Sequence, residues 1–272
     1  MVLKAIKKMI PQGLKNKILS ALINPPYLGD RYVCPLCNTH LIDFNPLDKS
    51  LLELLDKHGY IHNIFQGETM NLVNYGCPAC NANDRDRLYA IYMNKVFKDT
   101  DTSEKYKFID FAPTPTLSGF IKKHDFLNYR SADLYAEGVD DVVDLMDMKI
   151  YEDNSVDMFL CSHILEHVDD DRKAMRELYR ILKKGGWGIA MVPILLNLNE
   201  VYEDPSITSP EDRWKHFGQD DHCRMYSKNG FIERLEEAGF KVNQLGREYF
   251  GEETFDLHGI HQRSVLYIVE KI

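Results

Sequence analysis

Four of the six cysteines occur in two pairs with metal-binding spacing, Cys34/Cys37 and Cys77/Cys80. Two thiolates separated by two residues can lie on one tight turn and point to one place, so two such turns supply the ligands of a tetrahedral zinc site. A zinc ion held by four protein ligands has no open position, which makes it structural. Redox disulfides or unligated buried cysteines remain the alternatives. We therefore expect a structural zinc module.

A second group of polar residues follows the predicted strands of the carboxyl-terminal part. Short apolar runs at 106–112, 129–134, 156–161 and 187–192 alternate with helical segments, which predicts an α/β fold with a mostly parallel sheet covered on both faces. The helix after residue 168 begins at Asp169-Asp170-Asp171 and is expected to end at Lys183-Lys184-Gly185-Gly186. Ligands of such sheets bind outside the carboxyl ends of the strands, so these strands must position the functional residues.

Four loops at these strand ends carry candidate cofactor-binding residues. Asp133 is placed where a carboxylate can accept hydrogen bonds from a ribose diol, and Asp144 could accept one from an exocyclic amine while Leu145 packs on a base. An aspartate at a strand end also commonly caps a turn, which is the simpler explanation for each. The candidates are Asp110, Phe111, Ala112, Pro113, Asp133, Leu134, Asp144, Leu145, Ser162 and His163.

The run DLMDMKIYEDNSVDMFLCSHILEHVDDDRKAMRELYRILKKGGWGIAMVP, residues 144–193, resembles class I S-adenosylmethionine-dependent methyltransferases from their third strand through their fifth. The resemblance covers about residues 104–272, and the whole chain is similar to bacterial methyltransferase-domain proteins with an amino-terminal Cys-x-x-Cys pair. It implies a Rossmann-like fold with a mostly parallel seven-stranded sheet and S-adenosylmethionine as cofactor. It also implies that Asp133 holds the ribose and that Asp144 lies near the adenine.

The first loop departs from the pattern of that family. Its glycines let the backbone approach the methionine part of the cofactor, whereas residues 110–116 read Asp-Phe-Ala-Pro-Thr-Pro-Thr. Thr114 and Thr116 are β-branched and cannot comfortably adopt a positive φ, and Pro115 has a fixed φ. We expect this loop to take another path and still present backbone N–H groups near a helix N-terminus.

Methyl transfer to a hydroxyl needs alignment and proton removal, for which histidine is the natural base. His163 follows the fourth strand and is the first candidate, with His222 the second. Acceptor contacts are expected from the segment after the fifth strand, where a solvated loop is the alternative, and from two arginines after the second cysteine pair. These acceptor-binding candidates are Arg85, Arg87, His216, Asp221, His222 and Arg224.

The charge distribution bears on partners and location. The net charge is −9 with no basic patch in the cysteine module, which makes nucleic acid an improbable partner. No apolar stretch is long enough to span a bilayer and no signal peptide is evident, so the expected location is the cytoplasm. The first 29 residues contain five lysines and no acid. Residues 1–23 could form amphipathic helices that contact the inner face of a membrane peripherally, or the helices could pack on the protein itself.

These observations predict three parts: amphipathic basic helices at 1–30, a zinc-binding module with a linking helix at 31–103, and a methyltransferase domain at 104–272. The predicted function is methylation of a hydroxyl on a small-molecule or glycan-type acceptor. One alternative is an RNA methyltransferase whose zinc module recognises nucleic acid. The other is a non-catalytic zinc-containing protein, binding a partner, whose cofactor loop has degenerated.

Overall fold

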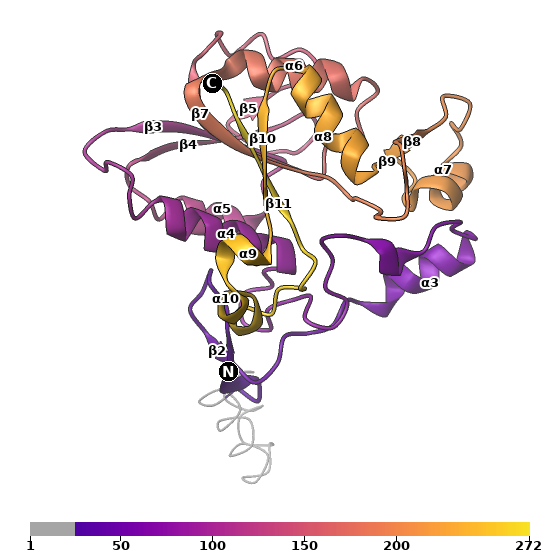
Figure 1. Ribbon diagram of the computed structural model, residues 1–272, viewed down its shortest axis with the longest axis horizontal. Coiled ribbons are helices and arrows are strands. Elements are labelled where there is room, and N and C mark those ends of the chain that lie inside the picture. The colour runs from indigo at the N-terminus through magenta and orange to yellow at the C-terminus, as the bar shows by residue number, and fades with distance from the viewer. Residues whose placement is uncertain (1–24) are drawn as a thin grey trace, which may run out of the picture.

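A computed structural model describes residues 25–272 of the chain. The helices expected within residues 1–30, and the membrane contact expected from residues 1–23, therefore lie almost wholly outside the described residues. The centre of the molecule is a seven-stranded sheet in the order β10-β11-β7-β6-β3-β4-β5 (Figure 1). Its strands are β3 (Tyr106–Phe111), β4 (Leu127–Asp133), β5 (Asp141–Val142), β6 (Val156–Ser162), β7 (Leu182–Met191), β10 (Lys241–Leu245) and β11 (Leu266–Glu270).

The sheet is parallel except at one strand. β3 pairs in parallel with β4 and β6, and the pairs β4–β5 and β6–β7 are also parallel. β11 runs antiparallel to both β7 and β10. Central strands of such a sheet are buried on both faces, which is why they are continuous apolar runs in the sequence. The α/β class and the mostly parallel seven-stranded sheet expected from the sequence are confirmed.

Helices cover both faces of the sheet (Figure 1). α4 (Asp84–Val96) and α5 (Pro115–Ile121) lie on one face, with α9 (Arg247–Phe250) and α10 (Glu252–Leu257) at the same side, and α6 (Asp171–Ile181) and α8 (Lys228–Glu237) lie on the other. Asp170 and Ser227 cap α6 and α8 through side-chain hydrogen bonds to backbone N–H groups. Such caps satisfy donors that have no partner within the helix. Both helices thus begin where the sequence predicted.

The end of α6 differs from the sequence prediction. Residues 183–186 were expected to close the helix, but α6 ends at Ile181 and Leu182 already begins β7. Gly185 has φ 81° in the strand, where the pairing with β6 shifts register. A Cβ on Gly186 would lie 2.7 Å from the Asp157 carbonyl oxygen. The two glycines therefore serve an irregular strand pairing instead of a helix cap.

The amino-terminal part packs directly on this sheet. It contains β1 (Leu28–Val33), β2 (His40–Leu41), α3 (Lys49–Lys57) and a 3-10 turn, η1 (Ile64–Gln66). Its buried residues Cys34, Leu36, Leu41 and Phe44 belong to the same apolar core as those of the sheet. α4 follows the second cysteine pair and contacts β7 through an edge-to-face pair of Tyr92 and Trp187, with ring centroids 5.2 Å apart. The cysteine module is thus anchored to the sheet by a shared core.

An insertion between β7 and α8 lies beside α3 (Figure 1). It consists of β8 (Tyr202–Glu203), α7 (Pro210–Phe217) and β9 (Arg224–Met225). The Ile61 N–H donates to the Lys215 carbonyl, and the rings of His58 and Trp214 stack at 5.2 Å. Segments far apart in the sequence therefore meet here and enclose space next to the sheet.

Within residues 25–272, no helix has the length and apolar character needed to cross a membrane.

Candidate functional site

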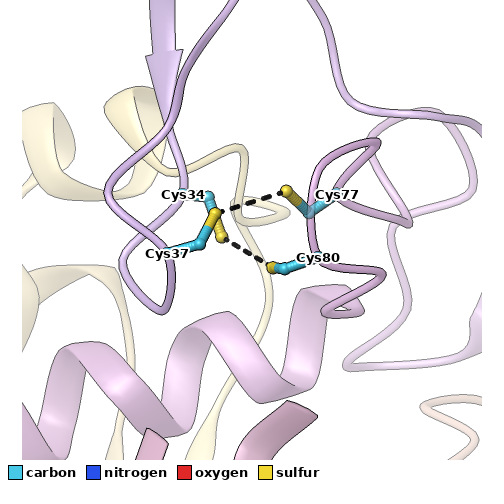
Figure 2. A group of neighbouring side chains, drawn as sticks. All are labelled: Cys34, Cys37, Cys77 and Cys80. Carbon is cyan, nitrogen blue, oxygen red and sulfur yellow. Dashed lines mark hydrogen bonds between the residues drawn. The ribbon is translucent and has the colours of Figure 1, made fainter.

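The four paired cysteines meet at one point (Figure 2). Cys34 Sγ lies 3.7 Å from Cys80 Sγ, and Cys37 Sγ lies 3.9 Å from Cys77 Sγ. Sulfur atoms bound tetrahedrally to zinc at about 2.3 Å are about 3.8 Å apart. All four thiols are free, and all four sulfur atoms lie within 4.8 Å of one another. The cluster has the donor set and spacing that a four-coordinate zinc ion requires.

The two cysteine turns have the same backbone design. In each, the N–H of the residue after the second cysteine donates to the carbonyl of the first, as Asn38 does to Cys34 and Asn81 to Cys77, both at 2.8 Å. Asn38 and Asn81 have φ of 56° and 62°, in the left-handed region that asparagine tolerates better than most residues. The turns therefore point their thiols inward because of local sequence, and tertiary packing brings the two turns together.

A cleft of about 400 Å³ opens at the carboxyl ends of β3, β4 and β6. Seven of the cofactor-binding candidates line it, namely Phe111, Ala112, Asp133, Leu134, Asp144, Leu145 and His163, and Asp221 lies beside them. Asp133 is the last residue of β4. The loops that carry Asp133 and Asp144 thus face the edge of the sheet where ligands of parallel α/β sheets bind.

In the first loop, one of the positions that hold glycine in the resembling family keeps a glycine-like backbone conformation. Ala112 adopts φ 51°, so alanine takes the left-handed conformation that a glycine would favour. Thr114 is extended at φ −100°, and Pro115 is the first residue of α5, where its fixed φ is suited and its missing N–H is not needed. Pro113 does not line the cleft. Within residues 110–116, Ala112 is thus the one residue with a positive φ, and α5 starts at the end of the loop.

Asp133 and Asp144 each accept hydrogen bonds from the loop that follows them. Backbone N–H groups of Tyr135 and Ala136 donate to Asp133 Oδ1 at 2.7 and 2.8 Å, and that of Met146 donates to Asp144 Oδ1 at 2.8 Å. One oxygen of each thus shapes its own loop, and no described residue donates a hydrogen bond to the other oxygen. Each aspartate therefore combines the turn-capping role with a carboxylate oxygen available to a ligand. Their binding roles stay predictions.

Two other candidates for the cofactor site lie away from the cleft. Asp110 is 1% exposed and accepts hydrogen bonds from Ser118 Oγ and Tyr129 Oη, both at 2.8 Å. Burial raises the pKa of Asp110 to about 6, against the lowering effect of these two hydroxyls. Ser162 Oγ pairs with Tyr89 Oη at 2.8 Å. These side chains fasten β3 and β6 to neighbouring elements and do not line the cleft.

A second cavity, of about 170 Å³, lies between α3 and the insertion, and its lining is mostly apolar. His163 lines both this cavity and the cleft. It follows β6 directly, with a strained φ of 57°. Burial, then the nearby Arg85 guanidinium, lowers the pKa of His163 to about 4. An uncharged imidazole therefore stands where the two spaces meet.

The acceptor candidates divide into two groups in the structure. Arg85 and His222 line the second cavity, where Arg85 Nη1 contacts His163 Nε2. Asp221 lines the cleft and lies 3.1 Å from His167 Nδ1. His216 lines neither space, and its Nδ1 pairs with Tyr202 Oη at 2.6 Å. Arg85, Asp221 and His222 therefore keep a possible role at the site, whereas His216 does not border it.

Arg87 and Arg224 are corrections to the sequence prediction. Arg87 is 0% exposed, and its guanidinium donates hydrogen bonds to the backbone carbonyls of Tyr75, Ala82 and Gly259. The guanidinium also stacks on the ring of Phe44. Arg224 is 4% exposed and donates to three carbonyls of residues 165–169 and to Glu203. A buried guanidinium needs such partners for its charge. Both residues hold loops together, and neither lines the cleft or the second cavity.

Several residues of the second cavity carried no sequence signal. Tyr60, Glu68 and Tyr75 line it from the segment between the cysteine pairs. Glu68 is 2% exposed and accepts from Tyr267 Oη at 2.7 Å, with Lys228 Nζ 3.2 Å away. No spacing rule marks these residues, because the cavity forms only where their loop folds against the β7–α8 insertion.

Comparison with known proteins assigns the class. Residues 128–190 match the model of the methyltransferase domain family, Methyltransf_11. These residues run from β4 to β7 and include Asp133, Asp144 and His163. The chain therefore carries, at these strands, a methyltransferase domain of the class I S-adenosylmethionine-dependent type. The enzyme class expected from the sequence is confirmed.

The chain is also similar to solved structures. For the CurJ carbon methyltransferase, the identity is 13% and the TM-score 0.44, over 69% of this chain and 57% of that one. For an S-adenosylmethionine-dependent methyltransferase from Archaeoglobus fulgidus, the identity is 13% and the TM-score 0.43, over 71% of this chain and 96% of that one. For one from Mesorhizobium loti, the identity is 13% and the TM-score 0.38, over 66% and 96%. Among curated proteins, none matches the sequence.

Proposed function

We propose that the protein methylates a hydroxyl of a small-molecule or glycan-type acceptor, and that its four-cysteine cluster holds a structural zinc ion. The observation that carries the proposal is the place of His163, which borders both the cleft at the strand ends and the cavity beside α3. A donor and an acceptor bound in these two spaces would meet at that residue. Bringing reactants together in this way accounts for much of the rate of a group transfer.

Residues that line the cleft could contact the ribose, the adenine and the amino-acid part of S-adenosylmethionine. Asp133 is available to the ribose, Leu145 can pack on the adenine and Asp144 can accept from its amine. The left-handed Ala112 lines the cleft and can let the first loop pass close to the amino-acid end of the cofactor. When bound, the cofactor supplies a methyl group on a sulfonium, so the protein's own residues have only to align the acceptor and receive its proton.

The second cavity suits a small acceptor group with a hydroxyl. Its walls include the side chains of Tyr60, Tyr75 and Phe217, which can pack on a sugar or aromatic ring, while Arg85 and Glu68 offer polar contacts. S-adenosylmethionine bound in the cleft would supply the methyl carbon and keep the electron pair of its carbon–sulfur bond, so these side chains would have only to direct the acceptor oxygen toward that carbon. The hydroxyl proton then passes to His163 once the acceptor displaces Arg85 from Nε2.

The zinc proposal rests on sulfur positions. The distances of 3.7 and 3.9 Å between paired sulfur atoms match four ligands around one ion. Such an ion would join the two cysteine turns, which no disulfide does among the described cysteines. Its role would be to hold the module that bears Arg85 and the loop of residues 58–76 against the acceptor cavity.

A methyl-transfer assay with labelled S-adenosylmethionine tests the acceptor class. We expect label to enter hydroxyl-bearing small molecules or nucleotide sugars in a base-stable ether linkage, and to enter RNA no faster than in a reaction without protein. His163→Ala should lower turnover at least tenfold and leave cofactor affinity within about twofold. The matched control is His216→Ala, a histidine that borders neither space. Label in RNA alone, or only in nitrogen or carbon acceptors, would overturn the proposal.

A further inference from the structure

A second cluster of metal-ligating side chains lies behind His163. Glu166, His167 and His222 each offer one ligand atom, and these atoms all lie within 4.8 Å of one another. The three residues come from the loop after β6 and from the insertion before β9, so tertiary folding alone unites them. This cluster shares no residue with the four cysteines.

Glu166 is the most unusual member. It is 0% exposed, and neither of its carboxylate oxygens accepts a hydrogen bond from the part of the chain that the structure describes. Among the histidine nitrogen atoms, His163 Nδ1 lies 3.1 Å from Oε1 and His167 Nε2 lies 4.0 Å from it, whereas Oε2 has no hydrogen-bond partner in the described residues. A buried carboxylate with so few contacts is costly, because these contacts replace only part of the hydration that it loses. A bound cation would supply that missing partner.

His222 is oriented as a ligand would be. It is 3% exposed, and its Nδ1 lies 3.0 Å from the Phe217 carbonyl oxygen, so Nδ1–H donates there and Nε2 keeps its lone pair. That Nε2 is buried and has no hydrogen-bond partner in residues 25–272. Metal-binding histidines typically donate their other ring N–H to a carbonyl or carboxylate in this way, which fixes the ring and its tautomer.

His167 has the same arrangement with a carboxylate. Its Nδ1 lies 3.1 Å from Asp221 Oδ2, which leaves Nε2 toward Glu166. The rings of His167 and His222 lie edge to face with centroids 4.5 Å apart. Two histidines with occupied Nδ1 atoms and one unpartnered carboxylate thus converge on a common point.

We propose that Glu166, His167 and His222 form a second metal site for a divalent transition-metal ion. Two imidazoles and one carboxylate are ligands that manganese, iron and zinc accept, and three protein ligands leave coordination positions open. The site borders both spaces, because His167 lines the cleft and His222 lines the acceptor cavity. An acceptor hydroxyl could occupy an open position, where the ion would orient the oxygen and lower its pKa.

This catalytic role rests on the proposed function, whereas the metal site itself does not. The experiment therefore measures ion binding without cofactor or acceptor. Mn²⁺ is the probe, because it favours carboxylate oxygen over thiolate sulfur and therefore competes poorly for the four thiols. The purified full chain is titrated with Mn²⁺, and the electron paramagnetic resonance signal of the free ion is followed.

We expect one saturable Mn²⁺ site per chain in the wild type. Glu166→Gln should weaken Mn²⁺ binding at least tenfold, since it removes the charged ligand. Asp221→Asn should weaken it by about 10- to 100-fold, because it removes only the carboxylate that orients His167. Asp221 is exposed, so this variant is expected to fold even if a change at buried Glu166 does not. The matched control is Asp220→Asn, at the exposed neighbour, which should bind as the wild type does.

The outcomes separate the two proposals. If the folded wild type binds no Mn²⁺, or if Asp221→Asn and Glu166→Gln both bind it as tightly as the wild type, the metal site is overturned whatever the enzyme methylates. If Mn²⁺ binds as expected but no hydroxyl acceptor is methylated, the metal site stands and the proposed acceptor class fails.

Discussion

Cys34 Sγ lies 3.7 Å from Cys80 Sγ, so a thiol of one Cys-x-x-Cys turn contacts a thiol of the other turn, 46 residues along the chain. Neither turn could hold a tetrahedral ion alone. The first turn directly follows β1, and α4 begins only a few residues after Cys80. A metal ion bound by all four thiols would therefore connect β1 to α4.

We predict one zinc ion at this cluster. Cys34→Ala combined with Cys77→Ala should remove one zinc equivalent per chain, measured by elemental analysis of the purified protein. The melting temperature should also fall, because metal binding and folding of such a module are coupled. Cys161→Ala is the control, since Cys161 is buried in β6 outside the cluster. A double variant that keeps its full zinc content would contradict the assignment.

Asp133 should contribute to cofactor affinity through its charge. Asp133→Asn retains an oxygen that can accept from the N–H groups of Tyr135 and Ala136, so the loop is preserved. The variant loses a charge-assisted acceptor for the ribose, which is worth about 1.5 to 3 kcal/mol. We expect S-adenosylmethionine to bind about tenfold or more weakly by calorimetry.

The control for that measurement is Asp140→Asn. Asp140 lies between β4 and β5, outside the cleft, and its Oδ2 accepts from Ser131. The Asp140→Asn variant should bind S-adenosylmethionine as tightly as the wild type does. Equal affinities for all three proteins would show that Asp133 does not hold the cofactor.

Asp110 should make folding stability depend on pH. Its pKa of about 6 in the folded protein exceeds the usual value of 3.8. Protonation thus favours the folded state, so this group's contribution to stability is full below about pH 4 and is lost as the pH rises through 6. Asp110→Asn removes that dependence. Relative to the variant, the wild type should lose about 2 to 3 kcal/mol of unfolding free energy between pH 4 and pH 7.

Urea unfolding of both proteins at several pH values measures this difference, and groups common to both cancel in the comparison. Curves of stability against pH that stay parallel would mean that Asp110 titrates normally. Tyr129→Phe offers a second check. It removes a hydroxyl that stabilises the charged carboxylate, so it should steepen the dependence.

Residues 1–23 are predicted to contact anionic membranes. The segment has Lys4, Lys7, Lys8, Lys15 and Lys17 and no acid, a composition that anionic lipid attracts by about 1 kcal/mol per basic residue near the surface. Its deletion should reduce co-sedimentation with phosphatidylserine vesicles and leave cofactor affinity within about twofold. A variant with the five lysines changed to glutamine should lose the binding too. Vesicle binding unaffected by the deletion would assign the segment another role.

Local sequence determined the strands, the starts of the helices and the two cysteine turns. Apolar runs separated by amphipathic helices predicted the parallel strands, and Asp170 and Ser227 marked their helix starts, because caps and periodicity act over a few residues. The Cys-x-x-Cys spacing predicted each thiol turn for the same reason. The carboxylates of Asp133 and Asp144 reached the cleft because the ends of parallel strands share one edge of the sheet.

Tertiary structure decided which polar side chains line a cavity and which are buried among hydrogen-bond partners. Arg85 and Arg87 are two residues apart on α4, yet Arg85 reaches the acceptor cavity and Arg87 is enclosed by backbone carbonyls. Glu166 and His222 come together only because the insertion folds over the loop after β6. Gly185 and Gly186 belong to β7, where they exchange backbone hydrogen bonds with Lys271, and they do not cap the preceding helix. Spacing along a chain cannot show such outcomes, because burial and hydrogen bonding depend on segments that meet only in the folded protein.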